Sequence, residues 1–476
     1  MHTGALHSIF QHFTNWQHWW LGAVGKTELP DVFRTWFAAQ DKWSREQVAT
    51  NTTDMWVHTG LLLDQFDGLM AGYNAVAPAE ANISTFHFQV LQAVGDLLDL
   101  LSALAGEAHP DYEHMQPADI MRSFHERTHC SALVRVNGDN TDFFAGHSSW
   151  FTFESMVRVF KHYNFRLSVP HLGSGATSFS SYPGLLSSLD DFYTNYDSGL
   201  IMLQTTNNIF NKALYDLVVP QSLLAWQRVR MANQYARSGP EWAAALAFHN
   251  SGTYNNAYLV PNTKLFTPGK ALPENFFTYC EQIPGEVHCA DNTEYLVFGH
   301  FPSYNVPFFR DIYDKSGYAQ VAARFAGNST AEDTLSGLNY QMAPRAKIFR
   351  RQAGNVHDLQ SFKAILRFNE FKTDPYAQGN PYAAICSRGD LASSNAAPNG
   401  CMDSKATSYA LFQKRVTHAV NGPTWGKWSG SDSLPPFAWN EQNGAFDGKY
   451  SHVGMPTEYA TDFEEQIPEY LQWNGM

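Results

Sequence analysis

Residues 128–150, THCSALVRVNGDNTDFFAGHSSW, hold the pattern that decides the fold. Two apolar runs, CSALVRV and FFAGHSSW, flank the turn-prone segment NGDNTD, which predicts an antiparallel β-hairpin. A turn centred directly after Gly138 places Cys130 opposite His147, and a turn shifted by one residue sets the two diagonally. In both registers the thiol and the imidazole lie on one face of the sheet, close enough to meet.

The pair formed by Cys130 and His147 has two chemical interpretations. A thiol beside an imidazole can ionise, and the thiolate is the nucleophilic form. Alternatively, Cys130 is a small buried residue that opens a strand, and His147 caps a main-chain carbonyl. A papain-like cysteine protease is a poor match, because it needs a helix after its cysteine and the residues after Cys130 alternate like a strand.

Two histidines just before this cysteine, His125 and His129, raise a zinc site as a further interpretation. Structural zinc sites need a second pair of Cys or His ligands at close spacing, and the sequence has none there. We therefore expect no metal and no other cofactor.

The overall composition limits the classes of partner. The 476 residues are 44% hydrophobic and 14% aromatic, which is enough apolar surface for a large core. The formal charge is −13 and Lys and Arg are not clustered, which argues against nucleic acid as a partner. No apolar stretch is long enough to span a bilayer, and a lipid surface stays open as a partner.

Signals for the cellular compartment disagree. Residues 1–26 lack the basic and apolar regions of a secretory signal, which alone indicates the cytoplasm. Asn-x-Ser/Thr sequons, typical of exported proteins, begin at Asn51, Asn82 and Asn328.

Four of the five cysteines form two close couples. Cys280 and Cys289 flank a Pro-Gly turn, and Cys386 and Cys401 flank a loop-like segment. A disulfide closing a loop of the second size contributes about 3 kcal/mol of stability. The alternative is four unrelated buried thiols. In both cases Cys130 is the cysteine left over.

The order of the predicted elements is mixed. Helices are expected over 86–106, over 153–163 and from Pro220 to residue 236, and strands over 199–207, 252–260 and 294–301. Residues 107–129 lose periodicity and gain Pro, His and charge, which predicts an exposed linker. Helices and strands in blocks, without strict βαβ alternation, favour an α+β sandwich over a doubly wound parallel sheet.

Beyond the hairpin, several sequence blocks resemble the phospholipase B-like family of lysosomal and secreted proteins. The blocks include HCSALVRV…FFAGHSSW, SFSSYPGLLSSLDDFY, LIMLQTTNNIFN, NSGTYNNAYLV, FPSYNVPFFRDIY and APRAKIFRR, in the family's order over residues 128–351. Weaker similarity extends toward residue 37 and nearly to the C-terminus. Family members also begin with a signal peptide and further strands, and the resemblance implies that this sequence starts after them.

The family is similar to the N-terminal-nucleophile hydrolases, so the resemblance implies a four-layer αββα sandwich. It also implies self-cleavage between His129 and Cys130. Residues 1–129 and 130–476 would then be two parts of one domain, with the nucleophile first in the larger part. A freed α-amino group has a pKa near 8 and can act as general base for its own thiol.

The resemblance also assigns roles to the remaining site residues. His147 would orient or polarise the site, and Asn207 or Asn305 would donate to the oxyanion. Trp150 would line the pocket, and Arg345 would hold a polar or acidic part of the substrate. For each Asn and for the Arg, the alternative is a structural cap or ion pair.

The function implied is hydrolysis of acyl groups from ester or amide bonds of lipid-like substrates in a lysosomal or secreted protein. The resemblance also allows a homodimer. The competing hypothesis is a processed but catalytically idle binding or scaffold protein in the same compartment.

Overall fold

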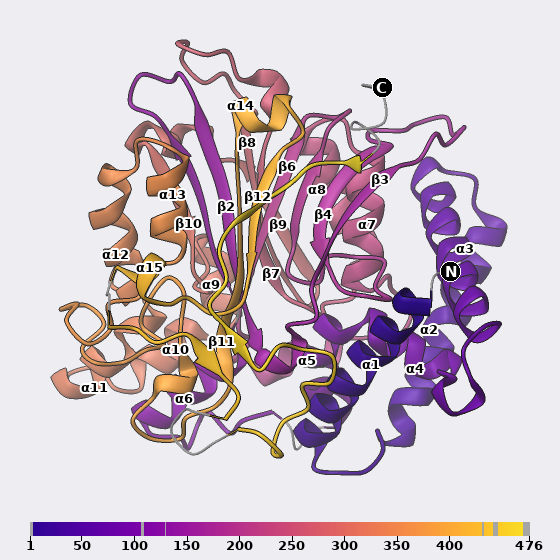
Figure 1. The fold of residues 1–476 in the computed structure, drawn as a ribbon, viewed down its shortest axis with the longest axis horizontal. Helices are drawn as coiled ribbons and strands as arrows, with labels where there is room; N and C mark the ends of the chain where they lie inside the picture. The colour runs from indigo at the N-terminus through magenta and orange to yellow at the C-terminus, as the bar shows by residue number, and fades with distance from the viewer. Residues whose placement is uncertain (1–2, 106–108, 129, 431–432, 441–445, 470–476) are drawn as a thin grey trace.

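The computed structural model describes residues 3–105, 109–128, 130–430, 433–440 and 446–469, and two antiparallel sheets lie at their centre (Figure 1). In spatial order, the first sheet contains β10 (His300–Ser303), β1 (Ser131–Val136), β2 (Phe143–Thr152), β11 (Asn399–Ser408), β12 (Thr417–Asn421) and β15 (Glu464–Gln466). The second contains β3 (Val159–Asn164), β4 (Ala176–Ser181), β5 (Phe192–Asn195), β6 (Leu200–Thr206), β7 (Asn256–Pro261), β8 (Phe277–Ile283) and β9 (Glu286–Asp291). A small ribbon joins β13 (Phe437–Ala438) to β14 (Glu458–Tyr459).

The two large sheets pack against each other through apolar side chains. Val134 and Phe143 of the first sheet share one buried cluster with Leu203, Leu259 and Tyr279 of the second. Because side chains alternate along a strand, every second residue of β1, β2, β6 and β7 points into this layer.

Helices cover the outer faces of both sheets (Figure 1). On the first sheet, Leu133 and Phe144 pack with Phe362 and Leu366 of a covering helix. On the second sheet, Met202 of β6 packs in a separate cluster with side chains of the helices that cover this sheet. The covering helices are α6 (Pro117–Arg127), α10 (Tyr318–Ala323), α12 (Pro344–Gln352) and α13 (Leu359–Leu366) on the first sheet, and α7 (Ala225–Tyr235) and α8 (Gly239–Ala247) on the second.

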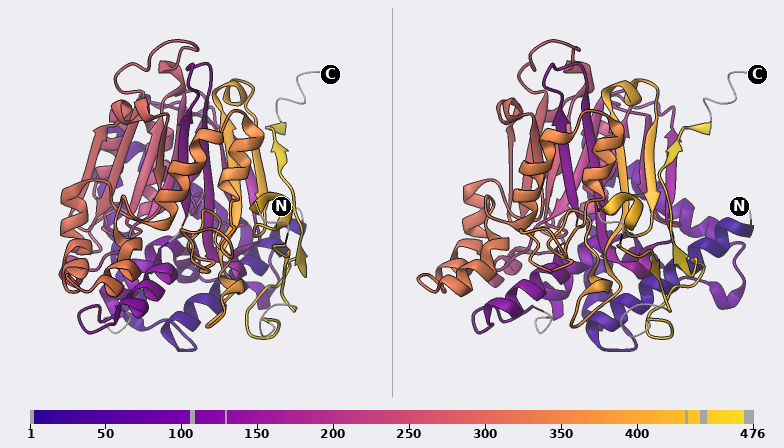
Figure 2. Two further views of the ribbon diagram at one scale, coloured as in Figure 1. Left: turned by 90° about the vertical axis from the view of Figure 1, so that its left-hand side faces the viewer. Right: turned by 60° about the vertical axis from the view of Figure 1, so that its left-hand side comes forward.

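The N-terminal helices pack across one end of the sheets (Figure 2). They are α1 (Thr3–Val24), α2 (Asp31–Thr50), α3 (Asp54–Asn74), α4 (Thr85–Gln92) and α5 (Val94–Ala105). The remaining helices are short: α9 (Arg310–Lys315), α11 (Ser329–Thr334), α14 (Tyr409–Gln413) and α15 (Gly426–Ser429). Short 3-10 helices are η1 (Ala79–Ala81), η2 (Phe153–Ser155), η3 (Lys212–Leu217), η4 (Thr263–Leu265), η5 (Thr293–Phe298), η6 (Leu335–Leu338), η7 (Ala353–Asn355) and η8 (Gly389–Leu391). The mixture of helices and antiparallel sheets confirms the predicted α+β class.

The predicted hairpin exists, but its register differs from both predicted ones. His147 pairs with Ala132, and Val136 with Phe143, so that residues 137–142 form a six-residue loop. Inside the loop, Asn140 takes a left-handed φ of 54° and donates its N–H to a neighbouring carbonyl. The longer loop moves the strands by two positions, so direct opposition of Cys130 and His147 was wrong.

The single helix predicted over 86–106 is two helices, α4 and α5, bent by 100° at Ala93. The bend brings Gly95 so close to Tyr254 that a Cβ at this glycine would lie 2.6 Å from the ring. Tertiary packing therefore overrides the continuous helical period. Within the described residues, no single helix is long and apolar enough to cross a membrane, and only this bent pair reaches that length and hydropathy.

Three further boundaries were wrong. Residues 153–163 form η2 and then β3, because Val159 to Tyr163 pair with β4. The segment predicted as a linker contains α6, whose Ile120 and Phe124 are buried. Helix α7 begins at Ala225 rather than near Pro220, since the distant Asp96 carboxylate accepts the Ala225 N–H.

The remaining strand predictions differ in outcome. Strands predicted over 199–207 and 252–260 are confirmed as β6 and β7. The strand predicted over 294–301 is mostly η5, and only β10 follows it. Both predicted disulfides are present, Cys280–Cys289 and Cys386–Cys401, and Cys130 is free.

Candidate active site

Cys130 lies immediately before β1 and is fully buried. Its φ of 83° falls in the left-handed region, which non-glycine residues rarely adopt and which costs about 1–3 kcal/mol. The main-chain carbonyl of Cys130 accepts a hydrogen bond of 2.8 Å from Arg345 Nη1. The fold thus holds a strained cysteine at the start of a central strand. His129, on the other side of the predicted cleavage bond, lies outside the described residues.

Arg345 is the hub of the contacts around Cys130. It is buried on the first turn of α12, and its Nη2 donates to Asn305 Oδ1 at 2.6 Å. Its guanidinium carbon lies 4.3 Å from the centre of the Trp150 ring, a cation–π contact. Arg345 Nη1 also donates to Ser131 Oγ at 3.2 Å. The Arg345 side chain therefore contacts three of the other sequence-predicted site residues.

Two asparagines, Asn305 and Asn207, belong to the same part of the site. Asn305 also has a left-handed φ, 71°, and its Nδ2 donates to the Thr206 carbonyl at the end of β6. The next residue, Asn207, is buried, and neither atom of its side-chain amide has a hydrogen-bond partner. A buried polar group without a partner is costly, and a ligand is one way to satisfy it. Asn207 is thus the amide with capacity left to bind.

The Trp150 side chain packs against the Cys386–Cys401 disulfide. The ring lies on β2, its Nε1 donates to the Ile385 carbonyl at 3.1 Å, and it shares a small cluster with Cys386 and Cys401. Because the disulfide holds the chain behind Trp150 in place, the wall of the site that Trp150 forms next to Arg345 has a fixed position.

His147 is fully buried between the two sheets and, in the part of the chain that is described, makes no hydrogen bond to Cys130. Its Nδ1 lies 3.4 Å from Ser149 Oγ, and its Nε2 has no hydrogen bond. Burial lowers the pKa of His147 well below its ordinary value, and the nearby Lys405 ammonium lowers it further. His147 is therefore neutral, and close to Cys130 only through the diagonal of the hairpin.

The thiol itself is not activated in the uncut chain. Burial raises the pKa of Cys130 well above its ordinary value, and the Asp190 carboxylate raises it further. A hydrogen bond from the Trp150 main-chain N–H works in the opposite direction. The protonated thiol dominates at neutral pH, so a nearby base is needed to form the nucleophile.

A network of buried ionic groups beside His147 was missed by sequence reasoning. Arg158 contacts Asp403 at 2.7 Å and Asp190 at 3.3 Å, and Asp403 accepts from Lys405 at 2.8 Å. Tyr182 also donates to Asp190. The available signal was the pair of charges two residues apart in CMDSKATS, since positions 403 and 405 of a buried strand share one face.

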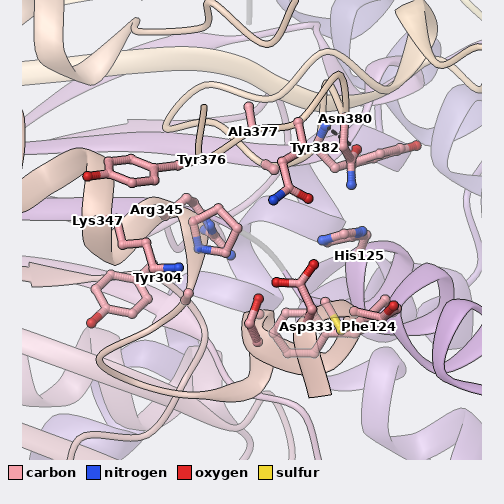
Figure 3. Close-up of a pocket in the computed structure, with 18 of the residues that line it drawn as sticks. Phe124, His125, Tyr304, Asp333, Arg345, Lys347, Tyr376, Ala377, Asn380 and Tyr382 are labelled. Atoms are coloured by element: carbon pink, nitrogen blue, oxygen red, sulfur yellow. Dashed lines mark hydrogen bonds between the residues drawn. The ribbon is translucent and has the colours of Figure 1, made fainter. Parts of the chain in front are cut away.

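A pocket of about 280 Å³ reaches the outer side of Arg345 (Figure 3). His125 of α6 and Tyr382 line one side of it, with their rings stacked at 5.2 Å. Tyr304 and Lys347 lie on the other side. Arg345 therefore connects the pocket to Cys130, and α6 forms part of the wall between solvent and the site.

No group of three or more His, Cys, Asp or Glu side chains within the described ranges is arranged to hold a metal ion. Of the six predicted site residues, Cys130, Trp150 and Asn305 each contact Arg345. His147 and Asn207 lie nearby with unpaired polar atoms.

The architecture and the buried cysteine define a two-sheet α+β protein whose site is built around a single free thiol. A sequence model of the Phospholipase B family matches residues 3–466. Phospholipase B of Crotalus adamanteus is 42% identical over 433 residues, which cover 90% of this chain and 74% of that protein. Phospholipase B-like 1 of Rattus norvegicus is 38% identical over 467 residues, 98% of this chain and 79% of the relative. Phospholipase B-like 1 of Homo sapiens is 40% identical over 448 residues, 94% and 76% of the two chains. The chain belongs to the phospholipase B family.

Proposed function

We propose that this protein is an acyl hydrolase of the N-terminal-nucleophile type, which acts on ester or amide bonds of lipid-like substrates once the bond between His129 and Cys130 is cut. The names of its relatives support the substrate class. The stacking of helices, sheet, sheet and helices supports the four-layer αββα sandwich of such hydrolases.

The observation that carries the proposal is the convergence on Cys130. Its thiol is free and buried, and its backbone is strained. Arg345 donates a hydrogen bond to its carbonyl and also contacts Asn305 and Trp150. A cysteine needed only for packing requires neither the strain nor the arginine. Relief of the left-handed φ would favour cleavage next to this residue.

The cleavage step balances with water as the only co-reactant. Cys130 Sγ attacks the carbonyl carbon of residue 129, the C–N bond breaks, and the amide nitrogen takes the thiol proton to become an amine. Water then hydrolyses the thioester, which leaves a carboxylate, a free thiol and a free α-amino group. That amine is the base which the buried thiol lacks in the uncut chain.

In turnover the same thiolate would attack the acyl carbonyl of the substrate. Asn207, whose amide is unpaired, is suited to donate to the oxyanion, together with the donors around Asn305. Arg345 would hold the polar end of the substrate in the pocket of Figure 3. His147 would act as a neutral polar group near the reacting carbonyl.

The experiment compares the wild-type chain with Cys130→Ala, Cys130→Ser and His147→Ala. In the wild type we expect two fragments, the larger one starting at Cys130, and deacylation of a phospholipid at acidic pH, and we expect neither in Cys130→Ala. Cys130→Ser should cleave slowly, and His147→Ala should cleave but turn over poorly. Fragments from Cys130→Ala would mean that another protease makes the cut. Cleavage without any deacylation would favour the idle scaffold.

We propose a lysosomal or secreted location on the same terms. Two disulfides are typical of oxidising compartments, and the sequon residues Asn82 and Asn328 are exposed. Release of mass by an N-glycan-specific amidase from protein made in eukaryotic cells is the measurement.

A further inference from the structure

The inner face of β2 and β11 carries a polar relay that ends at His147. Lys405 Nζ donates to Asp403 Oδ1 at 2.8 Å and to Ser149 Oγ at 2.5 Å. Ser149 Oγ in turn lies 3.4 Å from His147 Nδ1. All four side chains are at least nine-tenths buried, so each hydrogen bond has to be satisfied inside the protein.

The chemistry of Ser149 decides the direction of the relay. An ammonium group can only donate, so Ser149 Oγ accepts from Lys405. The serine proton is then free to be donated, and His147 Nδ1 lies within reach. If Nδ1 carried a proton instead, the serine O–H could donate only to the Asp403 carboxylate, which already accepts from Lys405 and Arg158.

The two cations near His147 favour its neutral state. From β11, the Lys405 ammonium opposes a second positive charge, and Arg158 before β3 does the same. Asp403 acts in the opposite sense but is already paired with both cations. The Gln204 main-chain carbonyl of the facing sheet acts in the same sense as Asp403, because it accepts a hydrogen bond from a ring N–H.

We propose that Lys405 and Ser149 are positioning residues that keep His147 neutral, with its proton on Nε2, so that the ring presents a hydrogen-bond donor and does not serve as a base. The unpartnered Nε2 is the atom that remains for a substrate carbonyl. The role in turnover rests on the proposed hydrolase function, whereas the proton position is a property of the folded chain and can be measured without activity.

The test is nitrogen-15 NMR of the full chain labelled at histidine, with the His147 signal assigned by its loss in His147→Gln. We expect Nδ1 to have the shift of an unprotonated nitrogen, Nε2 to carry the proton, and no titration of His147 down to about pH 5. A protonated Nδ1, or titration near the ordinary histidine pKa, would overturn the proposal.

Two variants test the relay separately. Ser149→Ala should mix the two tautomers, and Lys405→Met should raise the pH at which His147 titrates. The matched control is Ser148→Ala, whose hydroxyl bonds the Leu366 carbonyl and Ser404 on the opposite face of β2. An unchanged tautomer in Ser149→Ala would remove the relay, even if Lys405→Met fails to fold.

The kinetic readout links the relay to turnover. In Ser149→Ala we expect kcat to fall about tenfold with KM unchanged, as for one lost hydrogen bond at the transition state. A wild-type protein that shows the Nε2–H tautomer but no deacylation would contradict the hydrolase and leave the tautomer assignment standing. Equal loss in Ser148→Ala would reduce the effect to general instability.

Discussion

Arg345 and Cys130 are joined by a hydrogen bond of 2.8 Å from the guanidinium to the main-chain carbonyl, 215 positions apart in the sequence. The other end of the same guanidinium binds Asn305 at 2.6 Å. Both partners have a left-handed φ, 83° and 71°. The planar fork of the arginine therefore fixes two strained backbone segments relative to each other, which a flexible ammonium cannot do.

Arg345→Lys should accordingly lower kcat/KM by at least about tenfold, because an ammonium group cannot keep all three hydrogen bonds that the guanidinium donates in this buried site. The measurement is steady-state deacylation of a phospholipid by the cut protein. Arg350→Lys is the matched control, since Arg350 lies on the same helix but is exposed. Similar losses in both variants would contradict a specific role for Arg345.

The strain at Cys130 predicts a reversal of the usual order of glycine and alanine. In the uncut chain, Cys130→Gly should be more stable to urea than Cys130→Ala by about 1 kcal/mol, because glycine accepts a positive φ without a Cβ clash. At Ser131, an ordinary strand position, glycine should be the less stable of the two. If alanine is equal or better at position 130, the left-handed conformation is not retained in solution.

The two disulfides should differ in their effect on activity. Removing either one costs about 3 kcal/mol or slightly less by loop entropy. Only Cys386–Cys401 packs against Trp150, however, while Cys280–Cys289 joins β8 to β9 on the second sheet. We expect the double alanine variant of Cys386 and Cys401 to lower kcat/KM. The double alanine variant of Cys280 and Cys289 should lower only the urea midpoint. Loss of turnover in both would separate Trp150 from the effect.

Alternating and continuous apolar patterns predicted β6 and β7 well, because both faces of these strands are buried and the pattern has no competitor. The segment 153–163 shows the limit of the method. Phe153 and Met156 are buried as a helical face would require, but residues 159–163 form a strand. Short apolar runs satisfy both periods, and only the partner strand β4 decides between them.

Site residues could be predicted from the sequence where one residue type carries the chemistry. Cys130 stood out as the unpaired cysteine, the hairpin pattern placed His147 near it, and the other site residues came from family resemblance. The relay through Lys405 and Ser149 was not predictable, because it depends on the pairing of β11 with β2 across more than 250 residues. The hairpin register failed for a local reason, since a six-residue loop was taken for a two-residue turn.

The last prediction concerns acid and helix α6. Burial and the neighbouring Arg345 lower the pKa of His125 to about 3. The unfolded value is near 6.5, so the folded state binds this proton less tightly than the unfolded state does. The stability that neutral His125 contributes is complete above about pH 6.5 and is lost as the pH falls toward 3. Acid should therefore loosen α6, which forms one wall of the pocket beside Arg345.

Hydrogen exchange of the α6 amides, expressed as protection factors, measures this loosening in the uncut chain between about pH 7 and pH 4.5. We expect protection to fall in the wild type and to stay constant in His125→Phe, which can still stack on Tyr382 but cannot titrate. His114→Phe is the control, because His114 lies in the same segment but is exposed. A wild-type α6 that keeps its protection at pH 4.5 would mean that the His125 ring takes up a proton without cost and that acid does not open this wall.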